Sequence, residues 1–246
     1  MKSDSVILIG GSGAIGSALS EAFVRRGFAV GVLSPGLTSR LEDLQKRLPM
    51  VSTCEADATK KTSLRRGLDS LISILGAPAV LIYCAGLPPD VEFPIDEYPI
   101  RQWNRTLAVY ITGAFLTLRE AMRVLSPGGH VVMLSSAITR FSENSLPPIY
   151  AGHYAASKAA LDELCKWTRR ELHGHGVLLS RLAPCAVDME GLGQAPHRVL
   201  PPVSVTLTAV VQRVVDIVVG NEEIDEQMVG EEPPCSKSEK EKLCCG

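Results

Sequence analysis

Net charge, long apolar runs and paired cysteines are all scarce in this sequence. Its 25 lysine and arginine residues nearly balance 27 aspartate and glutamate residues, so the net charge is only −2. That balance leaves no basic footprint for nucleic acid or an anionic membrane. No apolar run approaches the ~20 residues of a membrane-spanning helix, and the seven cysteines include no C-x-x-C pair. We therefore expect reduced thiols, no metal, no nucleic-acid partner and no membrane.

An internal repeat and a second-domain boundary are also missing. The 246 residues suit one large α/β domain. Composition changes only near the end, where residues 231–246 are charged and contain Pro233-Pro234. We expect one domain over residues 1–230 and a flexible tail over 231–246. The first residues lead directly into a strand-like segment, so we expect no signal peptide and a cytoplasmic protein.

Apolar runs alternate with helix-like segments about six times. The first run, Val6–Ile9, is continuously apolar, as expected of a strand buried on both faces of a parallel sheet. The predicted strands are 6–9, 28–33, 51–54, 79–83, 130–134 and 177–182. The predicted helices are 17–26, 41–48, 62–75, 101–125, 154–173 and 206–219. This order predicts an α/β protein with a single doubly wound parallel sheet, Rossmann-like, with helices on both faces.

A glycine-rich loop, residues 10–16, joins the first strand to the first helix. Glycines at this place let the backbone approach a pyrophosphate, whose charge faces the helix N-terminus. An acidic residue that commonly binds ribose hydroxyls at the end of the second strand is replaced here by Ser34 and Pro35. Arg40 lies a few residues further on. The loop predicts a dinucleotide site, and its surroundings favour NADP(H) over NAD(H).

Tyr154 and Lys158 are four residues apart on one predicted helix, so they share a face. A lysine ammonium favours the ionised form of a nearby phenol, which makes the pair a candidate acid and base. Among the five tyrosines, only Tyr154 has a lysine four residues on. A pair of this kind is often no more than two surface residues, so the assignment depends on the rest of the chain.

Together these residues resemble the short-chain dehydrogenase/reductase family over roughly residues 6–219. The glycine loop, the segment Cys84-Ala85-Gly86 and the stretch Tyr154 to Leu161 carry the likeness. The resemblance implies that Ser136, Tyr154 and Lys158 are catalytic and that Asp57 contacts the adenine. The cofactor-binding residues are then expected to be Gly10, Ser12, Gly13, Ile15, Gly16, Ser34, Asp57, Ala85, Gly86, Tyr154, Lys158, Pro184 and Val187.

Several positions depart from the family pattern. Tyr110 stands where the family has an asparagine that helps hold a water in the proton relay, and Cys84 stands where an asparagine is usual. Cys185 and Met189 replace a usual glycine and threonine. Ser136 and Tyr154 are 18 positions apart, which is longer than usual. Tyr150 lies nearer to Ser136, but a tyrosine rather than a lysine follows it by four. The family's final glycine-rich strand is not recognisable.

The resemblance implies reversible hydride transfer between nicotinamide and the carbonyl or alcohol of a small substrate. In the reductive direction Tyr154 gives its proton to the substrate oxygen, Ser136 hydrogen-bonds that oxygen, and Lys158 holds the nicotinamide ribose. Two alternatives stay open: a cyclase, isomerase or dehydratase on the same scaffold, and a catalytically silent nucleotide-binding protein.

Substrate and assembly are predicted more coarsely. Three loops, residues 87–99, 137–153 and 190–202, are expected to line the substrate site, and Leu146, Pro147, Pro148, Ile149, Leu192 and Leu200 suggest an apolar pocket. Family members are often built on the two long central helices, so we expect a homo-oligomer, a dimer or tetramer.

Overall fold

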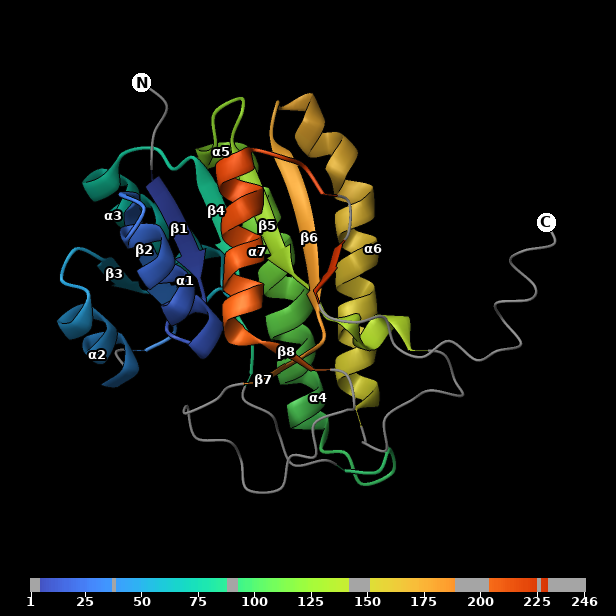
Figure 1. Ribbon diagram of the computed structural model, residues 1–246. Coiled ribbons are helices and arrows are strands. Elements are labelled where there is room, and N and C mark those ends of the chain that lie inside the picture. Colours follow the sequence, from blue (N-terminus) through green and yellow to red (C-terminus); the bar gives the residue numbers. More distant parts are fainter. Residues whose placement is uncertain are drawn as a thin grey trace.

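A computed structural model describes residues 5–36, 39–87, 93–141, 151–188, 204–224 and 227–229, with backbone alone for residues 39, 40, 188, 204, 227 and 228. Seven parallel strands form the main sheet in the order β3-β2-β1-β4-β5-β6-β9 (Figure 1). They are β1 (Ser5–Ile9), β2 (Ala29–Ser34), β3 (Ser52–Glu55), β4 (Val80–Tyr83), β5 (His130–Leu134), β6 (Leu178–Pro184) and β9 (Gln227–Val229). The doubly wound parallel sheet predicted from the sequence is confirmed.

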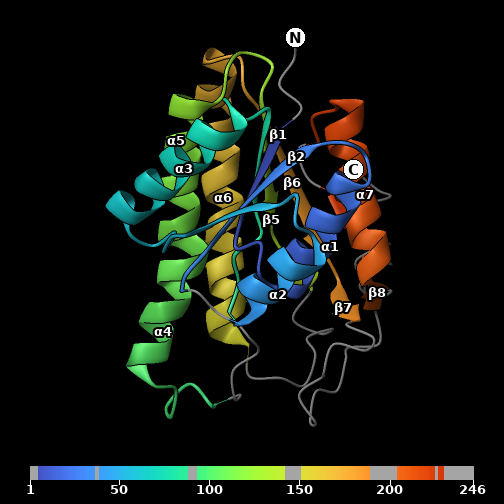
Figure 2. The same ribbon diagram turned by 90° about the vertical axis from the view of Figure 1, so that its left-hand side faces the viewer.

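Helices cover both faces of this sheet. Figure 2 shows α1 (Ala14–Val24), α2 (Ser39–Arg47) and α7 (Leu207–Gly220) on one side. The other side carries α3 (Lys61–Leu75), α4 (Ile100–Leu107), α5 (Ala114–Val124) and α6 (Gly152–Gly174). Within the described residues, no helix is long and apolar enough to cross a membrane.

The two cores follow from the alternation of side chains along buried strands. In β1, Ile7 and Ile9 pack into the core under α3, α5 and α6, whereas Val6 and Leu8 pack into the core under α1 and α7. All five β1 residues are buried. The strand therefore contributes apolar side chains to both faces, as its uninterrupted apolar sequence predicts.

Helix ends follow local sequence signals. The chain turns at Gly27 (φ 82°) after α1 and at Gly76 (φ 78°) after α3, where positive φ favours glycine. Thr206 caps α7 by accepting the Ala209 N–H at 3.2 Å. Asn221 ends the same helix in the left-handed conformation.

Three features differ from the sequence-based expectation. The helix predicted over 101–125 is interrupted by a π-helical segment, η1 (Ala108–Gly113), which separates α4 from α5. The sequence shows no glycine-rich final strand, and the structure adds a three-residue strand, β9, that pairs in parallel with the end of β6. A small parallel pair, β7 (Ala186–Asp188) and β8 (Ser204–Thr206), was not predicted.

The strand order reverses at β1, which lies between β2 and β4. In open parallel sheets, the crevice outside the carboxyl ends at such a point is where ligands bind. The carboxyl ends lie at the lower end of Figure 1, together with the amino end of α6. The predicted site residues are therefore expected to lie at this edge.

Candidate active site

The glycine loop packs directly against the turn after β4. A Cβ atom on Gly10 would lie 2.3 Å from the Ala85 Cα, so only glycine fits, and its φ of 89° also favours glycine. A Cβ on Gly16 would lie 2.4 Å from the Gly11 Cα, which lets α1 start close to the loop. Gly13 is the N-cap of α1 and has no side chain to cap it. The backbone here is arranged as a close-approach turn at a helix N-terminus, which suits a phosphate group.

Ser12 and Ser34 are joined by a hydrogen bond between their hydroxyls, which links the glycine loop to the end of β2. Ser34 is buried, and its carbonyl accepts the Ala56 N–H at 2.9 Å. Ile15 lies in the first turn of α1 and packs against the apolar core below it. The structure thus brings the loop and the predicted ribose end of β2 together.

Two basic residues bear on the predicted cofactor preference. Arg40 belongs to α2, but its side chain lies outside the described residues. Arg47, on the same helix, donates from Nη2 to Ser17 Oγ at 2.8 Å, which places a guanidinium beside the first turn of α1. The sequence reasoning missed Arg47, because its position depends on how α2 packs rather than on any motif.

Asp57 follows β3 and is held by its own turn. Its Oδ1 accepts the Thr59 N–H at 2.9 Å and the Thr59 hydroxyl at 2.6 Å, and Oδ2 lies 3.1 Å from Lys60 Nζ. Burial would raise the pKa of Asp57, but these contacts lower it below its usual value. The carboxylate is therefore charged and fixed at the carboxyl edge of the sheet.

The turn after β4 is closed by backbone and sulfur contacts. Cys84 donates its N–H to the Ile9 carbonyl at 2.9 Å, and its thiol donates to the same oxygen at 3.4 Å. Burial raises the pKa of Cys84 to about 12, so it remains an unreactive thiol. Gly86 lies under Tyr110, because a Cβ added to it would be 3.4 Å from the Tyr110 hydroxyl.

Lys158 is almost completely buried, with 4% of its surface exposed. Its ammonium donates to the Leu134 carbonyl of β5 at 2.8 Å and lies 4.4 Å from the centre of the Tyr110 ring and 5.7 Å from that of Tyr154. Burial lowers the pKa of Lys158 to about 8, and the nearby Asp162 carboxylate opposes this effect. The predicted pair is thus brought together at the end of β5.

Tyr110 occupies the position of the family's asparagine and touches both members of the pair. Its ring meets that of Tyr154 edge to face, with centroids 5.3 Å apart and planes at 74°. Its hydroxyl accepts the Leu87 N–H at 3.1 Å. An aromatic face beside a buried ammonium provides cation–π attraction in place of an amide.

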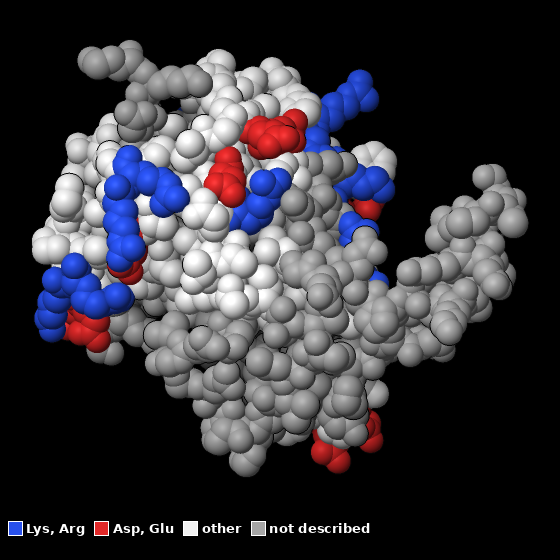
Figure 3. All heavy atoms as spheres, in the orientation of Figure 1, with Lys and Arg blue, Asp and Glu red and all other residues white. Residues whose placement is uncertain are grey.

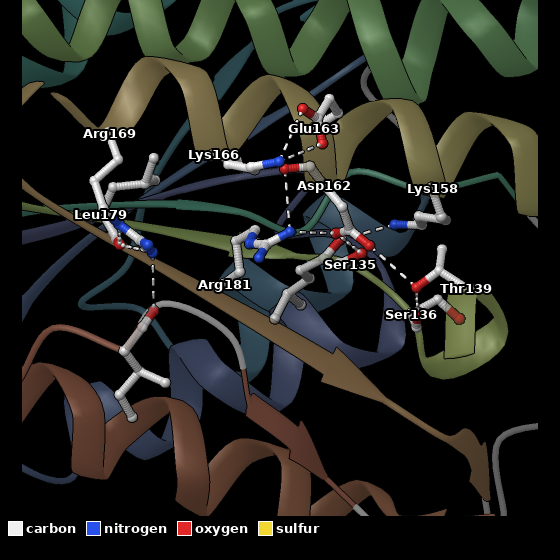
Figure 4. Close-up of polar contacts among 12 residues, drawn as sticks. Ser135, Ser136, Thr139, Lys158, Asp162, Glu163, Lys166, Arg169, Leu179 and Arg181 are labelled. Carbon is white, nitrogen blue, oxygen red and sulfur yellow. Dashed lines mark hydrogen bonds and ion pairs between the residues drawn. The ribbon is translucent and has the colours of Figure 1, made fainter. Parts of the chain in front are cut away.

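Ser136 is the N-cap of a short 3₁₀ helix, η2 (Ala137–Arg140), that follows β5. Its Oγ accepts the Ile138 N–H at 3.3 Å. The neighbouring Ser135 donates to Asp162 of α6, the helix that carries Tyr154. Figure 4 shows Ser135 and Thr139 in contact with Asp162, with Ser136 beside Thr139.

The last predicted cofactor contacts follow β6. Pro184 ends that strand opposite Val229 of β9, and Val187 lies in β7 opposite Val205. Cys185 donates its N–H to the Val229 carbonyl at 2.9 Å. Met189, Tyr150, the loop 190–202 and the proposed apolar lining residues lie outside the described residues.

Comparisons with known proteins identify the family of this chain. Residues 4–198 match the family model described as short chain dehydrogenase. An NADPH-dependent aldehyde reductase-like protein of Arabidopsis thaliana is 31% identical over 164 residues, which are 64% of this chain and 58% of that protein. Sorbitol dehydrogenase of Cereibacter sphaeroides is 26% identical over 76% of this chain and 71% of its own.

Solved structures show the same fold. A dehydrogenase/reductase from Sinorhizobium meliloti 1021 superposes with a TM-score of 0.81 at 20% identity, covering 96% of each chain. A short-chain dehydrogenase from Burkholderia cenocepacia J2315, in complex with NADP, gives 0.78 at 20% identity over 91% of this chain and 95% of its own. The sheet order and the glycine loop at its carboxyl edge are those of a dinucleotide-binding fold. The chain belongs to the short-chain dehydrogenase family and is an NAD(P)-dependent oxidoreductase of that class.

Proposed function

We propose that this protein is an NADP(H)-preferring reductase or dehydrogenase that acts on the carbonyl or alcohol of a small, apolar substrate, with Tyr154 as the acid and base. The observation that carries the proposal is the buried ammonium of Lys158, which lies beside the Tyr154 ring at the carboxyl end of β5. A buried cation next to a phenol is the arrangement that favours proton transfer by that phenol.

The residues at the strand ends fit a dinucleotide. The close approach of Gly10 to Ala85 and the α1 N-terminus at Gly13 would hold the pyrophosphate. Ser12, Ile15, Gly16 and Ser34 would flank it, with Asp57 at the adenine and Gly86, Pro184 and Val187 toward the nicotinamide. The bound nicotinamide supplies or accepts the hydride.

The side chains of this chain handle the proton and the charge. In the reductive direction Tyr154 gives its proton to the substrate oxygen, and Ser136 donates a hydrogen bond to that oxygen as negative charge develops. Lys158 holds the ribose and, as a cation, favours the ionised form of Tyr154. Tyr110 covers the ammonium with its ring face.

The preference for NADP(H) is supported by two features near the end of β2, the lack of a carboxylate at Ser34 and a nearby guanidinium. Ser34 places a hydroxyl where a carboxylate would repel a 2′-phosphate, and Arg47 brings a guanidinium to Ser17 nearby. One related structure is a complex with NADP, and one relative is named as NADPH-dependent. These observations point the same way as the sequence.

An apolar substrate is supported by aromatic rings next to the catalytic helix. Tyr98 stacks on His153, which precedes Tyr154, with centroids 4.2 Å apart. Phe93 meets Tyr98 edge to face at 6.1 Å. These rings supply flat apolar surface for a small carbonyl compound.

Assembly and location complete the proposal. Phe115 of α5 and Trp167 of α6 are 48% and 71% exposed, which supports a homo-oligomer formed through these helices. Cys54, Cys84 and Cys165 are free thiols, which supports a cytoplasmic location. The predicted tail, residues 231–246, lies outside the described residues.

Binding and turnover with the full chain test this function. NADPH and NADH are titrated by nicotinamide fluorescence, and a panel of aldehydes and ketones is screened by loss of nicotinamide absorbance. We expect NADPH to bind about tenfold more tightly than NADH, which is about 1.4 kcal/mol, and to be oxidised with at least one carbonyl compound. Tight binding with no oxidation across the panel would contradict the proposal and favour a non-redox enzyme.

A single substitution provides the matched comparison for the cofactor. Ser34→Asp puts a carboxylate at the end of β2, so we expect it to weaken NADPH binding more than NADH binding. An equal effect on both nucleotides would contradict the proposed position of the 2′-phosphate.

A further inference from the structure

Asp162 lies one helical turn after Lys158 on α6, on the face that meets the end of β5. Its side chain is largely buried, with 15% exposed. In Figure 4 it lies at the centre of a group of polar contacts between α6, β6 and the turn after β5. Neither the family motif nor the proposed chemistry uses this carboxylate.

The two carboxylate oxygens hold two different hydroxyls. Oδ1 accepts from Ser135 Oγ at 2.5 Å, and Oδ2 accepts from Thr139 Oγ1 at 3.1 Å. Ser135 precedes Ser136 and Thr139 follows it by three residues, so Asp162 holds both ends of the turn that carries Ser136. Hydrogen bonds to a charged acceptor are roughly twice as strong as neutral ones.

The carboxylate is itself fixed from the opposite side. Arg181 of β6 donates from Nη1 to the Asp162 carbonyl at 3.1 Å, and the same nitrogen lies 3.4 Å from Oδ1. The Arg181 side chain is 8% exposed. A buried carboxylate that is paired and hydrogen-bonded in this way has little freedom to change its position.

Contacts within the turn at residues 135–139 orient the Ser136 hydroxyl. Ser136 Oγ accepts the Ile138 N–H, and the Ser136 carbonyl lies 3.1 Å from Thr139 Oγ1, whose single hydrogen it shares with Asp162 Oδ2. With its oxygen held as an acceptor, the hydroxyl keeps its own hydrogen to donate. A donor to a developing negative charge is effective only when it is held close to the productive geometry.

From these contacts we propose that Asp162 is a positioning residue, which holds the Ser136 turn in register with the helix that carries Tyr154 and Lys158. The inference rests on the proposed function, because Ser136 is the donor to the reacting oxygen there. Asp162 does not touch the substrate in this account and acts through Ser135 and Thr139.

The double variant Ser135→Ala/Thr139→Val of the full chain tests this role. It removes both hydroxyl donors and leaves Asp162 paired with Arg181, so no buried charge loses its partner. We expect kcat to fall about 10²-fold, with KM and NADPH affinity little changed. Deuterium exchange at the Ile138 amide should become faster, because its acceptor Ser136 Oγ is no longer held in place.

The matched control is Ser73→Ala/Thr168→Val, which removes two hydroxyls that donate to helix carbonyls away from the site. It should leave kcat and Ile138 exchange unchanged. In Asp162→Asn the amide oxygen can still accept from Ser135, and the amide nitrogen can donate to Thr139 Oγ1, whose own hydrogen then goes to the Ser136 carbonyl. This variant should therefore retain most of the wild-type kcat.

Unchanged kcat in Ser135→Ala/Thr139→Val overturns the positioning role, as does an equal fall in the control variant. Unchanged Ile138 exchange overturns the proposed hold on the turn. If no carbonyl compound in the panel supports NADPH oxidation by the wild-type chain, the proposed function fails. The exchange measurement still decides whether Asp162 orders the turn.

Discussion

The charged ammonium of Lys158 is buried among protein groups rather than surrounded by water. Its ammonium has one backbone acceptor, the Leu134 carbonyl, and two aromatic rings around it. Burial lowers its pKa to about 8. In the unfolded chain a lysine titrates near 10.4. The protein therefore gains a cation close to Tyr154 at some cost in folding free energy.

The lowered pKa of Lys158 predicts that the stability of the protein depends on pH. Between pH ~8 and ~10.4 the unfolded chain binds more protons at this residue than the folded chain, so its contribution to stability increases as pH rises. We expect the free energy of unfolding of the wild type, relative to Lys158→Met, to increase from pH 8 to 10. Urea denaturation at several pH values measures this difference.

Lys166 supplies the control, because it is an exposed lysine on the same helix, with 65% of its side chain accessible. Comparison with Lys166→Met separates the effect of burying an ammonium from any general effect of pH on the chain. A flat difference for Lys158→Met would show that Lys158 titrates normally and that its ammonium is not desolvated.

At the residue scale, the sequence identifies pairs on one helix but not contacts across the fold. The spacing of Tyr154 and Lys158 is visible in the sequence, and so is Asp162 four residues on. Its partners Ser135 and Arg181 lie 27 and 19 residues away. Only the packing of β5, α6 and β6 brings these residues together, so the role of Asp162 could not be inferred without the structure.

At the scale of elements, the π-helical segment η1 brings Tyr110 into the site. Tyr83 of β4 donates its hydroxyl to the Val109 carbonyl, inside this segment. Burial raises the pKa of Tyr83, so the phenol stays protonated and remains a donor. A Cβ on Gly113 would lie 2.3 Å from the Tyr83 hydroxyl. The glycine and the phenol therefore fit one another, and π-helical turns often occur at functional sites.

This fit predicts that Gly113→Ala lowers the free energy of unfolding by about 1–3 kcal/mol, because the new methyl group collides with the Tyr83 hydroxyl. In the Tyr83→Phe background the nearest atom is the ring carbon at 3.3 Å, so the same substitution should cost less. Urea denaturation of the two single variants and the double variant measures the coupling. Strictly additive costs would show that the hydroxyl does not set the requirement for glycine.

The interruption of the helix at η1 could not be predicted from the sequence, which indicates a single helix over 101–125. The apolar periodicity and the small residues near Gly113 suit a continuous helix, and the side chain that occupies the space beside Gly113, Tyr83, lies on a different element, β4. The seventh strand was missed for a related reason. β9 is three residues long, and it becomes a strand by pairing with β6 rather than by its own propensity.

At the scale of the whole molecule, the sheet order decides what the site can be. The sequence predicted the parallel sheet because strand-like and helix-like segments alternate along the chain and the first strand is continuously apolar. The glycine loop follows that strand, at which the order reverses. On the face shown in Figure 3, acidic and basic side chains are interspersed over the described surface. The proposed catalytic and cofactor-binding residues lie instead at the carboxyl edge of the sheet, where the ends of β1, β4, β5 and β6 are neighbours.

The central claim is that Tyr154 transfers the proton in an NADP(H)-dependent reaction. The most direct measurement is the turnover of Tyr154→Phe with NADPH and the best carbonyl substrate, with Tyr150→Phe as the matched control. We predict a loss of about 10²–10⁴-fold in kcat for Tyr154→Phe, unchanged NADPH affinity, and wild-type turnover for Tyr150→Phe. Wild-type turnover in Tyr154→Phe would contradict the account.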